Sequence, residues 1–169
     1  MSRTARLTLS LVVALLAPLA SARAQNSFSV AAGASFPTST FGDLHDIGYH
    51  VGVGIGIQPP TSPLGFRFEG MFNEFDRSGI GSVKTRVLGA TANASANLSG
   101  KFGPYLIGGL GLYNTKNTNG GGDSSDIGFN LGGGFRFELT GFSAYAEARY
   151  HRVGDGVATF IPVTFGLTF

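Results

Sequence analysis

The sequence predicts an all-β protein in which eight antiparallel strands close into a barrel. Two observations support this prediction. Eight segments of about ten residues alternate apolar with small or polar side chains, and the connections between them alternate between short turns and longer polar loops. Because successive side chains of a strand point to opposite faces, each segment has one apolar and one polar face. No stretch after residue 24 shows a convincing helical period of apolar residues.

Residues 1–24 are expected to be a cleaved signal peptide, and residues 25–169 the barrel domain. Two arginines precede an apolar run, and small residues lead to a cleavage site after Ala24. The run contains Pro18 and is shorter than the ~20 apolar residues of a spanning helix, which argues against a membrane anchor. Cleavage would leave nine Lys and Arg against ten Asp and Glu, a net charge of −1. No nucleic-acid partner is therefore expected.

The first four segments can be assigned faces by their alternation. The alanine-rich fourth segment could form a helix, but its unbroken two-residue polar alternation favours a strand. The predicted apolar faces are Phe28, Val30, Ala32, Ala34 and Phe36 in 27–36; Tyr49, Val51, Val53, Ile55 and Ile57 in 48–57; Leu64, Phe66, Phe68, Gly70 and Phe72 in 64–75; and Leu88, Ala90, Ala92, Ala94, Ala96 and Leu98 in 87–98.

Of the last four segments, three can be assigned faces and one cannot. Residues 104–113 are apolar on both sides, so their alternation does not say which side faces inward. The predicted apolar faces of the others are Phe129, Leu131, Phe135, Phe137 and Leu139 in 127–139; Phe142, Ala144, Ala146, Ala148 and Tyr150 in 142–151; and Ile161, Val163, Phe165, Leu167 and Phe169 in 160–169.

The connections predict that one end of the barrel has tight turns and the other has loops. The turns are expected at 58–63, 99–103 and 140–141, and the longer polar loops at 37–47, 76–85, 115–126 and 153–159. Strands of about ten residues with this asymmetry are typical of an eight-stranded antiparallel up-and-down transmembrane β-barrel.

The charges on the polar faces favour a barrel in lipid over a sandwich in water. Only 13% of residues are charged, fewer than a solvated outer face would carry. Three arginines and three glutamates form a balanced set, and each buried ion needs a partner, so a barrel-interior charge network is expected with glycines making room for it. Its predicted members are Arg67, Glu69, Arg136, Glu138, Glu147 and Arg149. The alternative is a soluble sheet with scattered surface ion pairs.

The last segment ends as an apolar stripe of alternate residues: Ile161, Val163, Phe165, Leu167 and Phe169. This stripe resembles the C-terminal assembly signal of bacterial outer-membrane proteins, and the chain after residue 24 is similar to the small OmpA/OmpX-like β-barrel family. The resemblance implies export to the bacterial outer membrane. It implies three kinds of partner: membrane lipid and lipopolysaccharide, the outer-membrane assembly machinery, and an unidentified extracellular ligand.

Three histidines and several loop aspartates are candidates for functional sites. Neither His45 with Asp43, Asp46 and His50 nor the aspartates at 123 and 126 have a recognised metal-ligand spacing, so no metal or cofactor is expected. His151 lies where eight-stranded lipid A deacylases carry their catalytic histidine, but Val153 replaces the serine of that family's local pattern. We expect His151 to cap the network at Glu147 and Arg149.

The sequence therefore predicts a non-enzymatic barrel with a structural or surface-interaction role through four short loops. The alternatives are an adhesin or ligand-binding barrel, a lipid A-modifying hydrolase, a pore, and a soluble periplasmic β-barrel that binds an apolar ligand. A pore is not expected because side chains fill the interior of an eight-stranded barrel.

Overall fold

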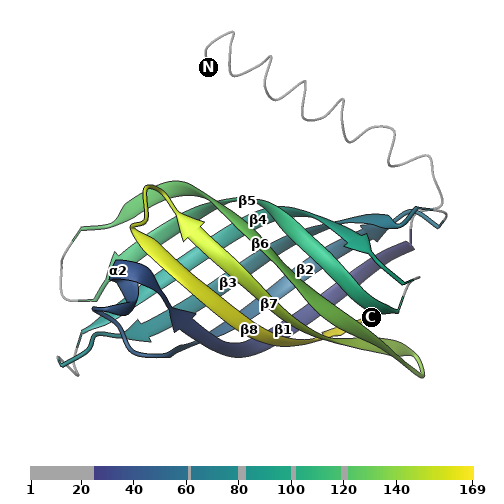
Figure 1. The fold of residues 1–169 in the computed structure, drawn as a ribbon, viewed down its shortest axis with the longest axis horizontal. Helices are drawn as coiled ribbons and strands as arrows, with labels where there is room; N and C mark the ends of the chain where they lie inside the picture. Colours follow the sequence, from purple (N-terminus) through teal and green to yellow (C-terminus); the bar gives the residue numbers. More distant parts are fainter. Residues whose placement is uncertain (1–24, 61, 80–82, 100–101, 119–121) are drawn as a thin grey trace, which may run out of the picture.

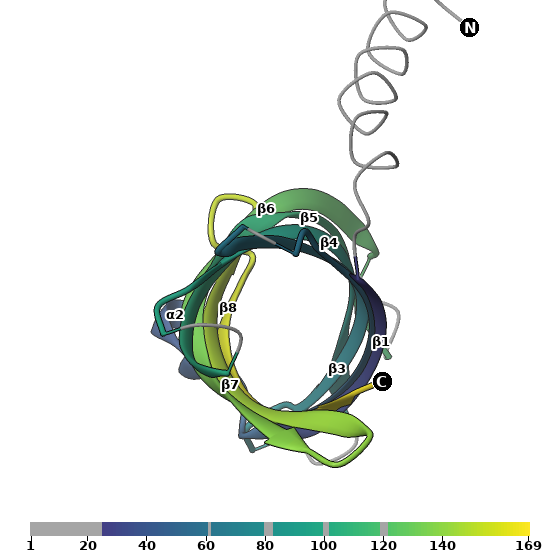
Figure 2. The same cartoon turned by 90° about the vertical axis from the view of Figure 1, so that its right-hand side faces the viewer.

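Eight antiparallel strands close into a single barrel (Figures 1 and 2), as the sequence predicted. The computed structural model describes residues 25–60, 62–79, 83–99, 102–118 and 122–169. The predicted signal peptide at 1–24 lies outside the described residues. The strands are β1 (Gln25–Pro37), β2 (Gly48–Gln58), β3 (Leu64–Asp76), β4 (Lys84–Asn97), β5 (Gly103–Asn117), β6 (Ser124–Leu139), β7 (Phe142–Val153) and β8 (Ala158–Thr168).

The barrel closes because β8 pairs with β1 along most of its length. The register runs from Ser29 opposite Thr168 to Pro37 opposite Phe160. Two further backbone bonds extend this seam, since Phe28 and Phe169 each donate an N–H to the other's carbonyl at 3.0 and 2.8 Å. Closure leaves no unpaired sheet edge.

The predicted apolar faces all point out of the barrel. Phe165 on β8 is 68% exposed and Leu131 on β6 is 64% exposed. Aromatic pairs lie on this outer face near both strand ends: Tyr49 with Phe72 and Phe129 with Tyr150 near the loops, and Phe142 with Phe169 near the turns. These pairs match the aromatic girdles expected at the two interfaces of a membrane barrel.

The segment that the sequence left unassigned, now part of β5, places its aromatic residues inward. Tyr105, Ile107 and Tyr113 are buried in the lumen, whereas Leu106 and Leu110 are exposed outside. The inward residues of β5 are mostly apolar, so no alternation with polar residues indicated which face points inward. A buried tyrosine hydroxyl still needs a hydrogen-bond partner.

The turns and loops lie at opposite ends, as predicted, but the loops are shorter than expected. The strands extend into the predicted loop segments, and β5 and β6 reach 15 and 16 residues. The first loop also contains a one-turn helix, α2 (Ser39–Gly42), which is too short to give a helical sequence period. Figure 1 shows α2 and the β7–β8 connection at one end, with the β6–β7 turn and the C-terminus at the other. Among the described residues, no helix is long and apolar enough to cross a membrane.

The lumen is filled differently at three levels. Near the turns it contains a cavity, and at mid-height it holds charged side chains. Near the loops it is apolar, which differs from the polar interior that the sequence indicated. The apolar cluster at the loop end consists of Phe41, Met71, Phe75, Val87, Tyr113, Val153, Ala158 and Phe160.

Candidate functional site

Four of the six predicted interior charges meet at mid-height of the lumen. Arg67 contacts Glu69 at 3.1 Å and also pairs with Glu147. Arg149 contacts Glu69 at 2.6 Å and Glu147 at 2.7 Å. Each carboxylate thus lies between two guanidinium groups, and the four charges sum to zero. We call this set the charge ring. Its side chains are at most 10% exposed.

Neutral polar side chains add hydrogen bonds to both carboxylates of the charge ring. The Tyr105 hydroxyl donates to Glu147 at 2.7 Å, and the Asn93 amide donates to Glu69 at 2.8 Å. Asn130 donates to Asn93 at 2.8 Å. Such hydrogen bonds offset part of the cost of burying the ion pairs. Side chains therefore occupy the lumen at this level, where an open channel would have to pass.

Glycines on the inward faces make room for the charge ring. A Cβ atom added to Gly132 would lie 2.7 Å from the Cα and 2.9 Å from the Cγ of Arg149. One added to Gly134 would lie 2.7 Å from the Tyr105 hydroxyl. These distances are too short for real contacts, so glycine is required where these long side chains cross the opposing strand.

Arg136 and Glu138 do not join the charge ring and form no ion pair among the described residues. The β6–β7 register places Gly134 opposite Glu147, so Arg136 lies opposite Tyr145, nearer the turns. Its guanidinium lies 5.1 Å from the centroid of the Tyr105 ring. Glu138 is exposed, and both residues line the cavity at the turn end.

The loop end of the barrel is held by packing around His45. Its ring stacks on Phe41 at 4.0 Å, and Phe41 packs edge-on against Phe75 at 5.2 Å. His45 Nδ1 lies 2.9 Å from the Phe41 carbonyl, and its Nε2 lies 2.7 Å from Thr85 Oγ1 on β4. Burial lowers the pKa of His45 below its ordinary value, which favours the neutral imidazole. His45 therefore fastens the first loop to the barrel mouth.

The structure does not bring the considered metal ligands together. Asp43 and Asp46 are exposed, whereas His45 is buried and bonded as described above. His50 lies inside the lumen, where its ring nitrogens contact Ser35 at 3.3 Å and Thr164 at 2.9 Å. In the described part of the chain, no three His, Asp or Glu side chains are grouped as metal ligands.

His151 has different partners from those expected. Its Nδ1 lies 2.9 Å from the Tyr113 hydroxyl, and its ring stacks on Phe160 at 5.1 Å. It therefore packs into the apolar cluster at the loop end and does not cap the Glu147 and Arg149 pair. The side chain is fully buried inside the barrel, so its imidazole faces away from the surrounding lipid.

The surface of the loop end combines paired charges with exposed apolar side chains. Glu74 pairs with Lys84 at 2.6 Å and Arg86 at 2.8 Å, and Lys116 pairs with Asp123 at 3.3 Å. This end carries five basic and seven acidic residues, a net charge of −2: Arg77, Lys84, Arg86, Lys116 and Arg152 against Asp43, Asp46, Glu74, Asp76, Asp123, Asp126 and Asp155. Its exposed apolar side chains are Leu44, Ile47 and Val157.

Sequence reasoning missed Tyr105 and the two asparagines that support the charge ring, and it missed Tyr113, which contacts His151. Tyr105 and Tyr113 lie in the segment that could not be assigned faces, and Asn93 and Asn130 alternate with the apolar residues of their strands but have no predicted role. The available signal was chemical: a tyrosine within an apolar strand implies a hydrogen-bond partner inside the barrel.

Known structures resemble this chain in fold. Neisserial surface protein A aligns over 85% of this chain and 94% of its own, at 20% identity and a TM-score of 0.65. The N-terminal β-barrel domain of Pseudomonas aeruginosa OprF aligns over 87% and 100%, at 19% identity and 0.54. Ail, the attachment invasion locus protein of Yersinia pestis, aligns over 86% and 99%, at 14% identity and 0.54. At these identities the likeness shows a shared fold.

The family comparison covers nearly the whole chain. No curated protein matches the sequence, but the family model for the outer membrane protein beta-barrel domain matches residues 7–169. The closed eight-stranded barrel and its apolar outer face agree with this match. The chain therefore belongs to the outer membrane protein beta-barrel domain family and is a β-barrel of the bacterial outer membrane.

Proposed function

We propose that this protein is a non-catalytic outer-membrane barrel whose loop end is a preformed contact surface for an extracellular protein. The observation that carries the proposal is an exposed apolar patch on an anchored loop. Leu44 is 46% exposed and Ile47 is 61% exposed, although His45 between them is buried. Exposed apolar patches on a protein surface mark interaction sites.

Backbone bonds hold this loop in place from two sides. Ser78 donates its N–H to the Leu44 carbonyl at 3.0 Å, and Asp46 donates to the Asp76 carbonyl at 2.9 Å. Thr38 donates to Thr159 on β8 at 2.8 Å. A surface ordered before binding loses less conformational entropy when a partner docks, which supports a recognition role for this loop.

The charge of the loop end favours a protein over a sulfated polysaccharide. Ail of Yersinia pestis has been crystallised with the heparin analogue sucrose octasulfate. The loop end of the present chain has a net charge of −2, and most of its basic groups are paired. A polyanion would be repelled, whereas a neutral or basic protein surface with apolar contacts would fit.

Catalysis and conduction have less support. His151 is buried in the lumen beside Tyr113, so it cannot reach a lipid ester outside the barrel. The charge ring fills the lumen at mid-height. The buried His151 does not provide the accessible catalytic base that a lipid A hydrolase requires. The filled lumen does not provide the open path that a pore requires.

The test uses the protein displayed on intact cells and two kinds of probe, an array of purified extracellular-matrix proteins and heparin beads. We expect saturable binding to a protein probe, a loss of at least about tenfold in the Leu44→Ser, Ile47→Ser double variant, and little binding to heparin. Thr40→Ala, an exposed change on α2, should bind normally. Binding that survives the double variant, or binding to heparin alone, would refute the proposal.

A further inference from the structure

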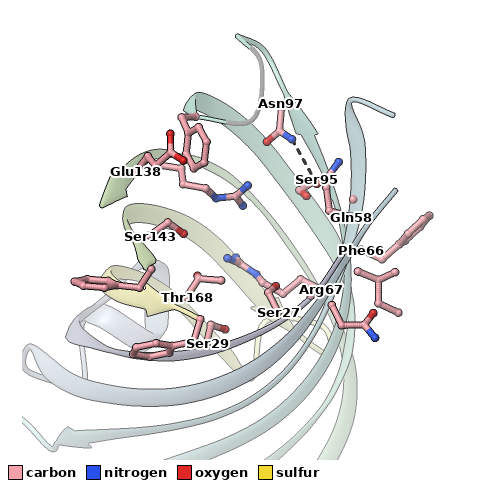
Figure 3. Close-up of a pocket in the computed structure, with 18 of the residues that line it drawn as sticks. Ser27, Ser29, Gln58, Phe66, Arg67, Ser95, Asn97, Glu138, Ser143 and Thr168 are labelled. Carbon is pink, nitrogen blue, oxygen red and sulfur yellow. Dashed lines mark hydrogen bonds between the residues drawn. The ribbon is translucent and has the colours of Figure 1, made fainter. Parts of the chain in front are cut away.

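The end of the lumen opposite the loops contains a cavity that no role described above uses. Its volume is about 350 Å³, and it is lined by residues of β1 to β4, β6, β7 and the last residues of the chain. Figure 3 shows Glu138 and Ser143 on one side, with Ser95, Asn97 and Gln58 on the other. Because the short turns of outer-membrane barrels face the periplasm, this cavity opens toward that compartment. Its size lies at the small end of the range for ligand sites.

Arg136 places an uncompensated positive charge in this cavity. The charge ring above it is neutral because its two arginines and two glutamates pair with one another. Arg136 forms no ion pair among the described residues, and its guanidinium lies over the Tyr105 ring at 5.1 Å from the ring centroid. A partly buried guanidinium of this kind can bind a carboxylate through two parallel hydrogen bonds.

Glu138 places a negative charge nearer the mouth of the same cavity. It lies two residues after Arg136, so it is on the same inward face of β6, displaced by about 6.6 Å along the strand. Among the described residues it has no basic partner, and it is exposed. The cavity is therefore positive inside and negative at its mouth, with the two charges separated by a defined distance.

Arg67, whose charge is paired within the charge ring, also lines the cavity, and hydroxyl and amide groups line much of the rest. Five hydroxyl groups line the cavity: those of Ser27, Ser29, Ser95, Ser143 and Thr168. Gln58 and Asn97 add amides, which contact one another at 3.4 Å. Such groups suit the peptide unit of a ligand, because hydroxyls and amides can each donate and accept.

We infer that this cavity binds a short zwitterionic peptide from the periplasm, with its carboxylate on Arg136 and its ammonium group toward Glu138. A dipeptide fits the volume, and its two end charges are separated by several ångströms, as are the two side chains. A simple anion would meet repulsion from Glu138 on entry, and a simple amine would meet Arg136 inside. The inference goes beyond the loop surface, since the two sites lie at opposite ends of the barrel.

The test follows the side-chain N–H signals of arginine by NMR in the folded protein purified from outer membranes. Three matched probes differ only at their ends: dialanine, N-acetyl-dialanine without the ammonium charge, and dialanine amide without the carboxylate. We expect saturable shifts of one arginine signal with dialanine, and binding weaker by about tenfold or more for each blocked probe.

Variants separate the two charged contacts. Arg136→Gln should remove the shifting signal and abolish binding, whereas Glu138→Gln should make N-acetyl-dialanine bind as well as dialanine. Arg152→Gln changes an exposed arginine at the loop end and should leave binding unchanged. A heat-dependent shift in gel mobility verifies that each variant is folded.

Three results would overturn the inference. They are the absence of a saturable shift with dialanine in the native protein, equal binding of N-acetyl-dialanine to the native protein, and unchanged binding by the folded Arg136→Gln variant. The extracellular binding assay is independent of all three, so failure of one proposal leaves the other standing.

Discussion

Single side chains in the lumen stabilise the barrel through several contacts each. Glu147 illustrates this, since it touches Arg67, Arg149 and Tyr105 while being almost completely buried. Removing one member of such a ring leaves the opposite charges without compensation, and desolvation then acts against the folded barrel.

Replacing Glu147 with glutamine should destabilise the barrel by about 3–5 kcal/mol, because two buried guanidinium groups would then share one carboxylate. The measurement is the folded fraction on gels after equilibration in urea. Glu138→Gln removes an exposed carboxylate outside the ring and should cost less than about 0.5 kcal/mol. Equal losses in the two variants would contradict the role given to the ring.

His45 should make the attachment of the first loop sensitive to acid. Burial lowers its pKa from 6.5 when the loop is docked, while Asp46 and the Phe41 carbonyl oppose this and Arg77 adds to it. The undocked loop therefore takes up a proton more readily. Docking of the first loop is fully stabilised above about pH 6.5. It weakens as the pH falls from there through the lowered pKa of His45 in the docked loop.

Hydrogen exchange of residues 38–47 at pH 7.5 and pH 5 measures this effect. We expect faster exchange at pH 5 in the native chain. In the His45→Gln variant, which has no titrating ring, the correction for intrinsic exchange should leave no pH dependence. Acid protection of the native loop would show that the sign is wrong.

At the scale of the strand, close approach between neighbours depends on specific glycines. Gly132 on β6 faces Arg149 on β7, and a Cβ atom there would overlap the Ala148 carbonyl. Gly70 on β3 points outward, and a Cβ atom there meets nothing within 4 Å.

Gly132→Ala should therefore destabilise the barrel by about 1–3 kcal/mol through overpacking. Gly70→Ala is the matched control, because it makes the same chemical change on a strand and has space for the methyl group. Both are measured by urea titration. A smaller effect at Gly132 than at Gly70 would show that β6 and β7 separate easily.

We propose that the outward stripe of β8 together with the following Phe169 is the signal read by the assembly machinery: Ile161, Val163, Phe165, Leu167 and Phe169. Phe169→Ser should lower the amount of barrel in the outer membrane several-fold while leaving refolding into detergent nearly unchanged. Immunoblots of membrane fractions and refolding yields distinguish the two effects. A matching loss in both would assign Phe169 a purely structural role through its contacts with Phe28 and Phe142.

The whole molecule is a barrel closed by side chains at two levels, with an opening toward the turn end. The apolar cluster closes the loop end, and the charge ring closes the middle. At these two levels the eight strands enclose only enough space for side chains. Such a barrel is expected to stay folded in detergent while its lumen conducts no ions.

In planar bilayers we expect no stable single-channel conductance from the native protein. Unboiled samples should also migrate differently from boiled ones on SDS gels, which verifies that the protein tested is the folded barrel. Steady single-channel currents from samples that show this mobility difference would mean that the charge ring opens.

The sequence by itself determined the strands, their outward faces and the separation of turns from loops. These features are local, because a two-residue alternation gives one face of a strand wherever that strand lies. It also identified Arg67, Glu69, Glu147 and Arg149 as interior charges, since their strands' alternation places them opposite the apolar face that meets lipid.

Only the tertiary structure decided which interior residues meet. The register between β6 and β7 placed Gly134 opposite Glu147 and Arg136 opposite Tyr145, which separated Arg136 from the ring. Closure of the barrel brought Tyr105 to Glu147 and His151 to Tyr113. Alternation within one strand does not determine its register against the next strand. Which side chains meet across the lumen therefore depends on all eight registers together.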